Sequence, residues 1–463
     1  MNRKISVNVA LAITIIAMTV TFAITWLLSM YTFDSKVSAV AQLQAQYQKL
    51  AEIDTYTRGN YYGDIDDDVL FDQVAVGYMR GLGDRYSTYY TEQEYAELAG
   101  IENGTLVNVG IEVVRDADGS YQIVRVYEDS PAARAGVQPF GYITAVNGAE
   151  ARSFSNLSVL RSALYGEVGT DLTLDCLYNI SDTTSVTIRR SNYRAPTVET
   201  IVVGPYAYIR ISSFGTDTFS DFDYSLRQAQ NAGAQGLVFD VRGNAGGVFG
   251  DDLYNIIDML APLGTVAKSV NKTGTERVLA TSDANHVTLP MAVLVSDTTA
   301  GPAELFAASI RDMCGGKLVG TTTAGRGTIQ RSPYRLQDGS AISVTVAMLY
   351  TGKGESFDGV GLVPDDVLEG DSVTELMLLN PQPTSDIQVL RAFEVVRAMV
   401  RERGGDDPGP ATTGTPAISD TTDSSDISQS GGDAPQPDDS GADAESAPGT
   451  GDDSTADDSS PAA

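Results

Sequence analysis

Residues 291–330 read MAVLVSDTTAGPAELFAASIRDMCGGKLVGTTTAGRGTIQ. The apolar run Met291–Val295 predicts a buried strand, and a turn rich in Thr, Gly and Pro follows it. Apolar residues at helical spacing over Ala303–Met313 predict a helix, and Lys317–Val319 predicts a second short strand. A strand that ends in a tight turn and opens a helix is where many hydrolases place a nucleophile and an oxyanion hole. The stretch therefore predicts a catalytic turn.

The surrounding residues, 207–371, predict alternating strands and helices. The segments YAYIRISSF and GLVFDV read as strands, and DFDYSLRQAQNAG and FGDDLYNIIDMLA read as helices. This alternation predicts a layered α/β core with its site at the carboxyl ends of the strands. The octet DVRGNAGG (240–247) contains glycines that let backbone amides approach a ligand closely. Its spacing fits neither a Walker pattern nor a dinucleotide fingerprint.

Composition and charge exclude several classes of function. The chain has 463 residues and a net charge of −30, and the segment after Arg403 holds fourteen acidic residues and no Lys or Arg. This balance argues against nucleic-acid binding, and residues 404–463 are predicted to be a disordered acidic tail. Cys176 and Cys314 are expected to be buried small hydrophobes, and the single histidine, His286, lies in a polar loop sequence. We therefore expect no metal site and no cofactor.

The N-terminus predicts a membrane anchor. Residues 5–33 carry no charge and are long enough to cross a bilayer as one helix. Arg3 and Lys4 precede this segment, so the positive-inside rule places the N-terminus in the cytoplasm and the rest of the chain outside. The alternative is a cleaved signal peptide. We favour a single-pass anchor in the cell membrane because the apolar segment exceeds a usual signal core and the small-residue site at 39–41 lies well beyond it.

The next two regions differ in character. Residues 35–100 have helical periodicity, with Thr91 and Glu94 in a capping-box pattern. Residues 101–192 change to short β runs with glycine turns and resemble a PDZ domain. The resemblance rests on Val109, Gly110, Ile111 and Glu112 as the carboxylate-binding loop, on Asp129–Ala132, and on Val146–Gly148. It departs from that family at Gly141-Tyr142, where Gly-Asp is usual. The resemblance implies binding of C-terminal peptides by strand addition.

Together, these pieces resemble the carboxyl-terminal processing peptidases, also called tail-specific proteases, over about residues 61–390. The resemblance implies a layered ClpP/crotonase-like α/β serine-peptidase core at 193–403, with an inserted PDZ domain, an N-terminal helical segment and one transmembrane helix within 1–34. The remaining markers are Gly81–Asp84 with Tyr86-Ser87, Tyr208–Arg210 with Phe214, Asp240–Gly247, and Gly361 with Pro364-Asp365.

The family uses a serine nucleophile and a lysine base, and both positions differ here. Its serine lies three residues before a glutamate, which matches Glu304 and places Gly301 at the nucleophile position. Its lysine lies twenty-five residues beyond the serine, where this chain has Arg326, and Gln330 matches the glutamine that follows. Pro302 stands where the family's next residue donates an oxyanion N–H. An arginine stays protonated in proteins and cannot act as a base.

The second oxyanion donor in the family is a glycine amide of the glycine-rich turn, matched by Gly246 and Gly247. A relocated dyad would have to use Lys317 with one of the nearby hydroxyls, which belong to Ser296, Thr298 and Thr299. We expect a pseudopeptidase that binds unfolded or C-terminal peptide segments without cleaving them. The alternatives are an active serine-type endopeptidase with a rearranged site, and a regulatory subunit that forms homo- or hetero-oligomers with active family members.

Overall fold

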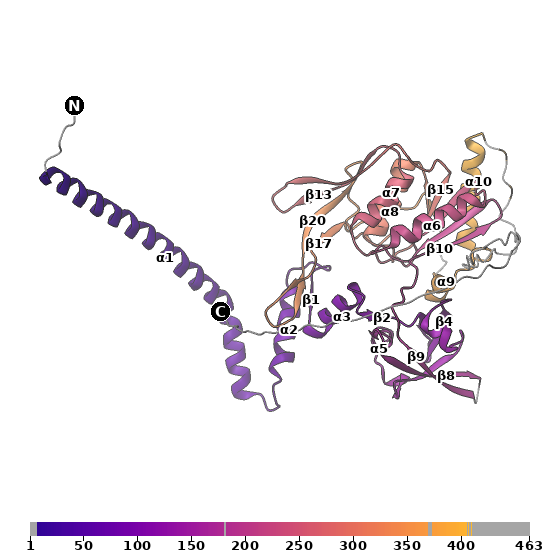
Figure 1. The fold of residues 1–463 in the computed structure, drawn as a ribbon, viewed down its shortest axis with the longest axis horizontal. Helices are drawn as coiled ribbons and strands as arrows, with labels where there is room; N and C mark the ends of the chain where they lie inside the picture. The colour runs from indigo at the N-terminus through magenta and orange to yellow at the C-terminus, as the bar shows by residue number, and fades with distance from the viewer. Residues whose placement is uncertain (1–6, 180–181, 369–372, 405, 407–408, 410–463) are drawn as a thin grey trace, which may run out of the picture. The chain divides into compact units, whose positions relative to one another are not determined.

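The computed structural model describes residues 7–179, 182–368, 373–404, 406 and 409, and Figure 1 shows its elements in chain order. Nearly all of the predicted acidic tail lies outside the described residues. The N-terminal region is helical, as predicted. Asp66 caps its second helix by accepting from Val69 N, and Thr91 and Glu94 form the predicted capping box on the third. The helices are α1 (Val7–Asn60), α2 (Asp67–Arg80) and α3 (Glu92–Glu102).

Within α1, the segment Leu11–Tyr31 is apolar over 21 residues and none of it is buried against the rest of the described chain. Its length suffices to cross a bilayer. An apolar helix near the N-terminus is either a membrane anchor or a signal sequence.

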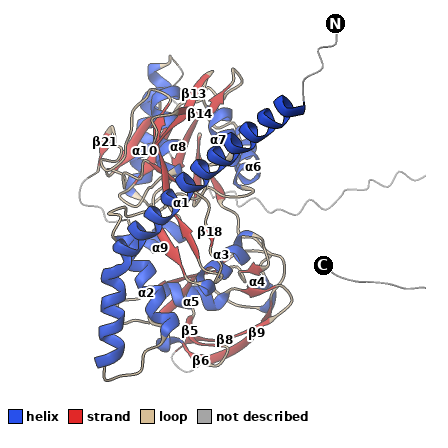
Figure 2. Cartoon of the chain, turned by 90° about the vertical axis from the view of Figure 1, so that its left-hand side faces the viewer, coloured by secondary structure: helices blue, strands red, loops and turns tan. Residues whose placement is uncertain are grey.

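Residues 106–189 form a separate β module with its own apolar core. Its main sheet has the order β3-β4-β5-β8-β9, in which β3 is an end strand, and β6 pairs with β5. Ile111 and Val113 of β3 pack in this core together with Leu160 and Leu164 of α5, the longer of the module's two α-helices. Figure 2 shows α5 with strands β5, β8 and β9 of the module. Its elements are β2 (Leu106–Val107), β3 (Ile111–Arg115), β4 (Tyr121–Val126), α4 (Pro131–Ala135), β5 (Tyr142–Val146), β6 (Ala149–Glu150), η1 (Ala151–Ser153), α5 (Leu157–Leu164), β7 (Gly166–Glu167), β8 (Asp171–Asn179) and β9 (Asp182–Arg189).

The predicted layered α/β core is present. Its six-stranded sheet has the order β10-β11-β12-β15-β16-β21, parallel throughout except for the antiparallel pair β10–β11. Because β11, β12 and β15 are buried along their whole lengths, they read as continuous apolar runs in the sequence. The strands are β10 (Val198–Val203), β11 (Tyr206–Ile211), β12 (Gly236–Asp240), β15 (Met291–Val295), β16 (Lys317–Gly320) and β21 (Asp366–Val367).

Successive residues of these strands face opposite layers. Leu237 and Phe239 of β12 pack with helices α6 (Thr218–Asn231), α7 (Asp251–Leu260) and α8 (Pro302–Cys314). Val238, between them, packs on the other face with α10 (Ile387–Glu402). Figure 1 shows α10 on the opposite side of the sheet from α6, α7 and α8. The period-two alternation thus buries both faces of the sheet and fixes the turns at its carboxyl edge.

Two further sheets were not predicted from the sequence. One has the order β14-β13-β20-β17 and the other has the order β1-β19-β18. The second joins the N-terminal region to the core, since Tyr89 of β1 pairs with Ile342 of β19. Their strands are β13 (Gly264–Asn271), β14 (Glu276–Ser282), β17 (Thr328–Gln330), β20 (Thr345–Thr351), β1 (Thr88–Tyr90), β18 (Tyr334–Arg335) and β19 (Ala341–Ser343).

Candidate active site

The turn between β15 and α8 has the sharp geometry of a nucleophile turn. β15 ends at Val295 and α8 begins at Pro302, whose fixed φ suits the first position of a helix. Gly301, just before it, has φ 57° and ψ −115°, a backbone conformation that residues with a Cβ adopt only under strain. Strained strand-to-helix turns of this kind hold the nucleophile in hydrolases with a nucleophile elbow. The turn therefore shares this backbone feature with a nucleophile elbow.

Glu304 ties this turn to the loop that carries Arg326. Its carboxylate is fully buried and accepts backbone N–H groups of Gly301 at 2.9 Å, Gly325 at 2.8 Å and Arg326 at 2.7 Å. The Thr323 hydroxyl donates to it as well. A carboxylate in the first turn of a helix also interacts favourably with the helix dipole. Glu304 thus positions the backbone at both the nucleophile and base positions without contacting the guanidinium in any hydrogen bond or ion pair of the described structure.

The guanidinium of Arg326 has neutral neighbours. Its Nη2 donates to Gln330 Oε1 at 2.7 Å, and its Cζ lies 5.1 Å from the centroid of the Tyr86 ring. The Gln330 amide is oriented by its own Nε2, which donates to Thr328 Oγ1 at 2.8 Å and Thr345 Oγ1 at 3.0 Å. Within the described part of the chain, Arg326 Nε is buried and has no hydrogen-bond partner. The site therefore retains a positive charge that cannot serve as a general base.

The Gly301 position has no nucleophile and little free space. Gly301 is buried, and a Cβ added there would lie 3.6 Å from Arg326 Cδ and 3.7 Å from Phe249 Cζ. These are ordinary van der Waals distances, so a small side chain fits sterically. The carbon atoms of Arg326 and Phe249 occupy the region that a larger side chain would enter.

One of the two oxyanion positions is altered, whereas the glycine-rich turn keeps its glycines. Pro302 has no N–H to donate. The Gly246 N–H donates to Asn244 Oδ1 at 2.9 Å, and a Cβ on Gly246 would lie 2.9 Å from Pro302 Cδ. Gly247 is exposed, and a Cβ there would lie 1.9 Å from the Phe214 carbonyl oxygen, so only glycine fits. The proline ring thus packs against the glycine-rich turn from which an oxyanion donor would come.

The nearby hydroxyls have structural partners. Thr299 is fully buried; its Oγ1 donates to the Val241 carbonyl at 2.8 Å and accepts from Ser296 N at 2.9 Å. Ser296 Oγ lies 2.9 Å from Thr298 Oγ1 and accepts from Gly243 N at 3.2 Å. None of these three hydroxyls has a lysine partner in the described structure.

Lys317, the only lysine of the 291–330 stretch, opens β16. Its Nζ forms an ion pair with Asp365 at 3.0 Å, and about half of its side chain is exposed. Its hydrogen-bond partner in the described structure is this carboxylate and not a hydroxyl of the turn. The described contacts therefore do not assemble a relocated dyad.

The N-terminal motif around Tyr86 and Ser87 is connected to the Arg326 region by hydrogen bonds. Ser87 Oγ donates to Asp84 and accepts from Thr345 N at 3.1 Å. Burial alone would raise the pKa of Asp84, but hydrogen bonds from Ser87 and Thr345 hold that pKa below its usual value. Because Thr345 Oγ1 also contacts Gln330, the motif reaches Arg326 through a chain of hydrogen bonds.

Asp240 and Arg242, at the start of the glycine-rich turn, form a buried ionic network. Arg242 donates to Asp240 Oδ2 at 2.6 Å and to Asp386 Oδ2 at 2.9 Å, just before α10. Burial would raise the pKa of Asp240, but the adjacent Arg242 and Arg210 lower it. Burial and the Asp240 charge together raise the pKa of the Tyr208 hydroxyl, which donates to Asp240 Oδ2 at 2.7 Å. The network joins the turn to the helix on the far face of the sheet.

The loop predicted to bind a carboxylate in the β module precedes and enters β3. Gly110 has φ 83°, and a Cβ there would lie 2.2 Å from Ser130 Cβ, so the position requires glycine. Its N–H donates to Asn108 Oδ1 at 2.7 Å. Val109 and Ile111 are buried in the module's core, whereas Glu112 points away from it and accepts from the Tyr127 hydroxyl at 3.3 Å. Burial raises the pKa of Glu112.

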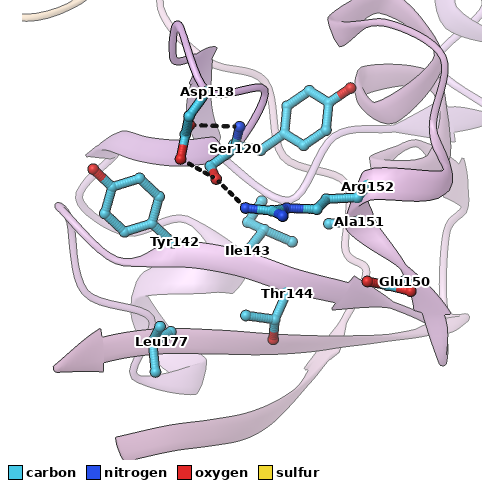
Figure 3. Close-up of a pocket in the computed structure, with 10 residues that line it drawn as sticks. Asp118, Ser120, Tyr142, Ile143, Thr144, Glu150, Ala151, Arg152 and Leu177 are labelled. Atoms are coloured by element: carbon cyan, nitrogen blue, oxygen red, sulfur yellow. Dashed lines mark hydrogen bonds between the residues drawn. The ribbon is translucent and has the colours of Figure 1, made fainter. Parts of the chain in front are cut away.

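A pocket of about 410 Å³ lies elsewhere in the module (Figure 3). Asp118 accepts from Ser120 N at 3.0 Å, and Arg152 Nη2 donates to Ser120 Oγ at 3.4 Å along its wall. None of the residues predicted from the sequence to form a site lines this pocket.

Comparisons with known proteins identify the core. Residues 205–368 match peptidase family S41. The carboxy-terminal processing protease CtpA of Bacillus subtilis is 28% identical over 342 residues, which cover 73% of this chain and 72% of that protein. The carboxyl-terminal-processing protease of Synechocystis sp. is 27% identical over 322 residues, covering 68% of this chain and 74% of that protein. The core carries a peptidase family S41 domain.

Among solved structures, the photosystem II D1 C-terminal processing protease matches with a TM-score of 0.43 and 23% identity. The match covers 71% of this chain and 86% of that one.

In this S41 domain, the structure brings Gly301, Pro302, Glu304, Arg326 and Gln330 together around one turn, with Gly246 against Pro302. Sequence reasoning did not find three residues that shape this site: Phe249, Thr323 and Thr345. Their only sequence signal is a place in loops or strands near the marked motifs. Tyr86 was noted as a marker, but its position over Arg326 was not foreseen.

Proposed function

We propose that this S41 family member binds peptide segments or protein C-termini without cleaving them. One observation carries the proposal: the strained turn between β15 and α8 is intact, but Gly301, Arg326 and Pro302 occupy the nucleophile, base and oxyanion-donor positions. Loss of the nucleophile alone costs on the order of a millionfold in a comparable serine protease. Loss of one oxyanion donor costs about 2.7–4 kcal/mol of transition-state stabilisation.

Peptide binding is assigned to the β module, which we interpret as a PDZ domain over residues 101–192. Two features support this interpretation: β3 is an end strand of its sheet, and the Val109–Glu112 loop leads into it. A peptide that adds beside such a strand makes main-chain hydrogen bonds with its edge. The comparison with proteases named for carboxyl-terminal processing supports a protein or peptide ligand.

We also propose that α1 anchors the chain in the cell membrane as a single span, with its N-terminus in the cytoplasm. The support is the apolar segment Leu11–Tyr31, together with Arg3 and Lys4 before it. Intact-mass measurement of the chain purified from membranes distinguishes an anchor from a cleaved signal peptide, which would remove this segment. Co-purification of an active S41 relative would favour the regulatory-subunit alternative.

To test whether the absence of these three residues abolishes cleavage, we compare the natural chain with the variant Gly301→Ser/Pro302→Ala/Arg326→Lys. Both are purified as full chains in detergent and assayed for cleavage of casein and for labelling by a fluorophosphonate probe. We expect neither reaction in the natural chain and both in the triple variant, since a Cβ at Gly301 fits without close contacts. Cleavage by the natural chain that disappears on Thr299→Ala would refute the proposal and support a rearranged site.

A further inference from the structure

The end strand β3 has an arginine at its edge that is already bonded. In the described sheet β3 pairs with β4 alone. Arg161, on α5, donates through Nη2 to the main-chain carbonyl of Val113 in β3 at 2.8 Å. A peptide added as a strand along this edge competes for such carbonyls with its own N–H groups. Arg161 therefore lies at the strand edge along which an added peptide would bind.

The same nitrogen of Arg161 holds a carboxylate from a distant part of the chain. Nη2 donates to Glu375 Oε1 at 2.6 Å, and Glu375 is the first residue of α9 (Glu375–Leu379). The two side chains are 38% and 46% exposed. Because ion pairs this exposed contribute about 1 kcal/mol or less, a ligand can displace Glu375 at little cost.

α9 contacts the β module at a second point and the core at a third. Arg125 of β4 donates to the Leu379 carbonyl at 3.4 Å. On the core, a Cβ added to Gly243 of the glycine-rich turn would lie 2.3 Å from Leu378 Cδ1. The helix that supplies Glu375 is thus packed against the glycine-rich turn.

We propose that Arg161 selects peptides with an acidic side chain, and that Glu375 forms an ion pair with the Arg161 guanidinium when no such peptide is bound. The inference rests on the proposed peptide binding along β3. A bound strand takes the Val113 carbonyl with its own N–H, which leaves the Arg161 donors to a side chain of the ligand. A carboxylate matches the guanidinium fork in charge and geometry, and Glu375 shows that a carboxylate reaches it. Glu112 lies close enough to interact with Arg161, and its negative charge disfavours an acidic ligand. A preference for an acidic ligand therefore requires direct contact between the ligand carboxylate and Arg161.

The test uses the full chain in detergent and two fluorescein-labelled decapeptides with a free C-terminal valine. The peptides differ only in carrying Glu or Gln at alternate internal positions, and affinity is measured by fluorescence anisotropy. We expect the natural chain to prefer the Glu peptide. Glu375→Gln should bind the Glu peptide about two- to fivefold more tightly, because the competing carboxylate is removed. Arg161→Gln should bind the two peptides with equal affinity.

Glu355→Gln is the matched control, since it removes one charge from an exposed residue that has no ion pair in the described structure. It should leave the preference unchanged. If the peptides bind but Arg161→Gln keeps the preference, or Glu375→Gln binds no more tightly than Glu355→Gln, the role of Arg161 is refuted while peptide binding stands. If no variant binds either peptide, the proposed binding along β3 is itself refuted. Circular dichroism melts of each variant show whether it is folded.

Discussion

Arg242 and Arg326 lie in loops that follow strands of the same parallel sheet, yet their surroundings are opposite. Arg242 follows β12, is 1% exposed and pairs with two carboxylates, those of Asp240 and Asp386. Arg326 follows β16, is partly exposed and bonds to the neutral amide of Gln330 over the Tyr86 ring. One guanidinium has its charge matched, whereas the other is left without an ion pair in the described structure.

The difference separates a charge that holds the fold from one that lies in the proposed site without an ion pair in the described structure. Buried charges are tolerated when oppositely charged partners satisfy them, so we interpret the Arg242 network as a structural element. Arg326 lies at the position that we assign to the base, and its hydrogen bond to the neutral Gln330 amide does not require a full charge. We therefore expect the two residues to differ sharply in their contribution to stability.

The largest effect is expected from Arg242→Met. It leaves Asp240 buried without its main partner, which typically costs about 3–5 kcal/mol. Thermal unfolding followed by circular dichroism on the detergent-solubilised chain measures the change. Arg227→Met is the control, because Arg227 forms an exposed pair with Asp223 and should cost less than about 1 kcal/mol. Equal melting temperatures for the two variants would contradict a structural role for the Arg242 network.

Glu304→Gln should have the next largest effect. The amide cannot replace a carboxylate that accepts three backbone N–H groups and a hydroxyl, so we expect a loss of about 2 kcal/mol. The same melts measure it, with the exposed Glu355→Gln variant as control. A loss no greater than that of Glu355→Gln would mean that the buried carboxylate does not join the two site loops.

Acid should weaken the Arg242 network with a definite sign. The pKa of Asp240 is lowered in the folded state, so its contribution is present above the unfolded value near about 4 and is lost as pH falls through the folded value. One proton changes the unfolding free energy by at most about 1.4 kcal/mol per pH unit. Urea titrations below pH 4 should therefore show a shallower pH dependence for Asp240→Asn than for the natural chain. Parallel slopes would show that Asp240 does not titrate with unfolding.

Much of the fold was predictable because several elements carry a local pattern. The apolar runs of β12 and β15 and the helical spacing of α8 are each visible within a dozen residues. The sheet containing β13 and β20 was not predicted, since its pairing of Ser269 with Leu349 joins residues far apart in the chain.

The candidate site also has some features that the sequence predicts and others that it does not. The spacing of Gly301, Glu304 and Arg326 could be read from the sequence, and the structure places them around one turn. The stacking of Tyr86 on Arg326 and the orientation of Gln330 by Thr345 could not, because both depend on the β1–β19 and β17–β20 pairings. Local spacing finds the residues of a site, whereas their partners come from tertiary contacts.

Arg326→Met should have the smallest effect on stability and so sharpens the contrast with Arg242. The substitution removes one hydrogen bond to Gln330 and the contact with Tyr86, but it also removes a buried Nε that lacks a partner in the described structure. These terms oppose one another, since a net hydrogen bond contributes about 1 kcal/mol and an unpaired buried donor costs about 1–3 kcal/mol. We expect a net change within about 1 kcal/mol in the same melts. A loss as large as that of Arg242→Met would mean that Arg326 holds the fold and that its charge has a partner in solution.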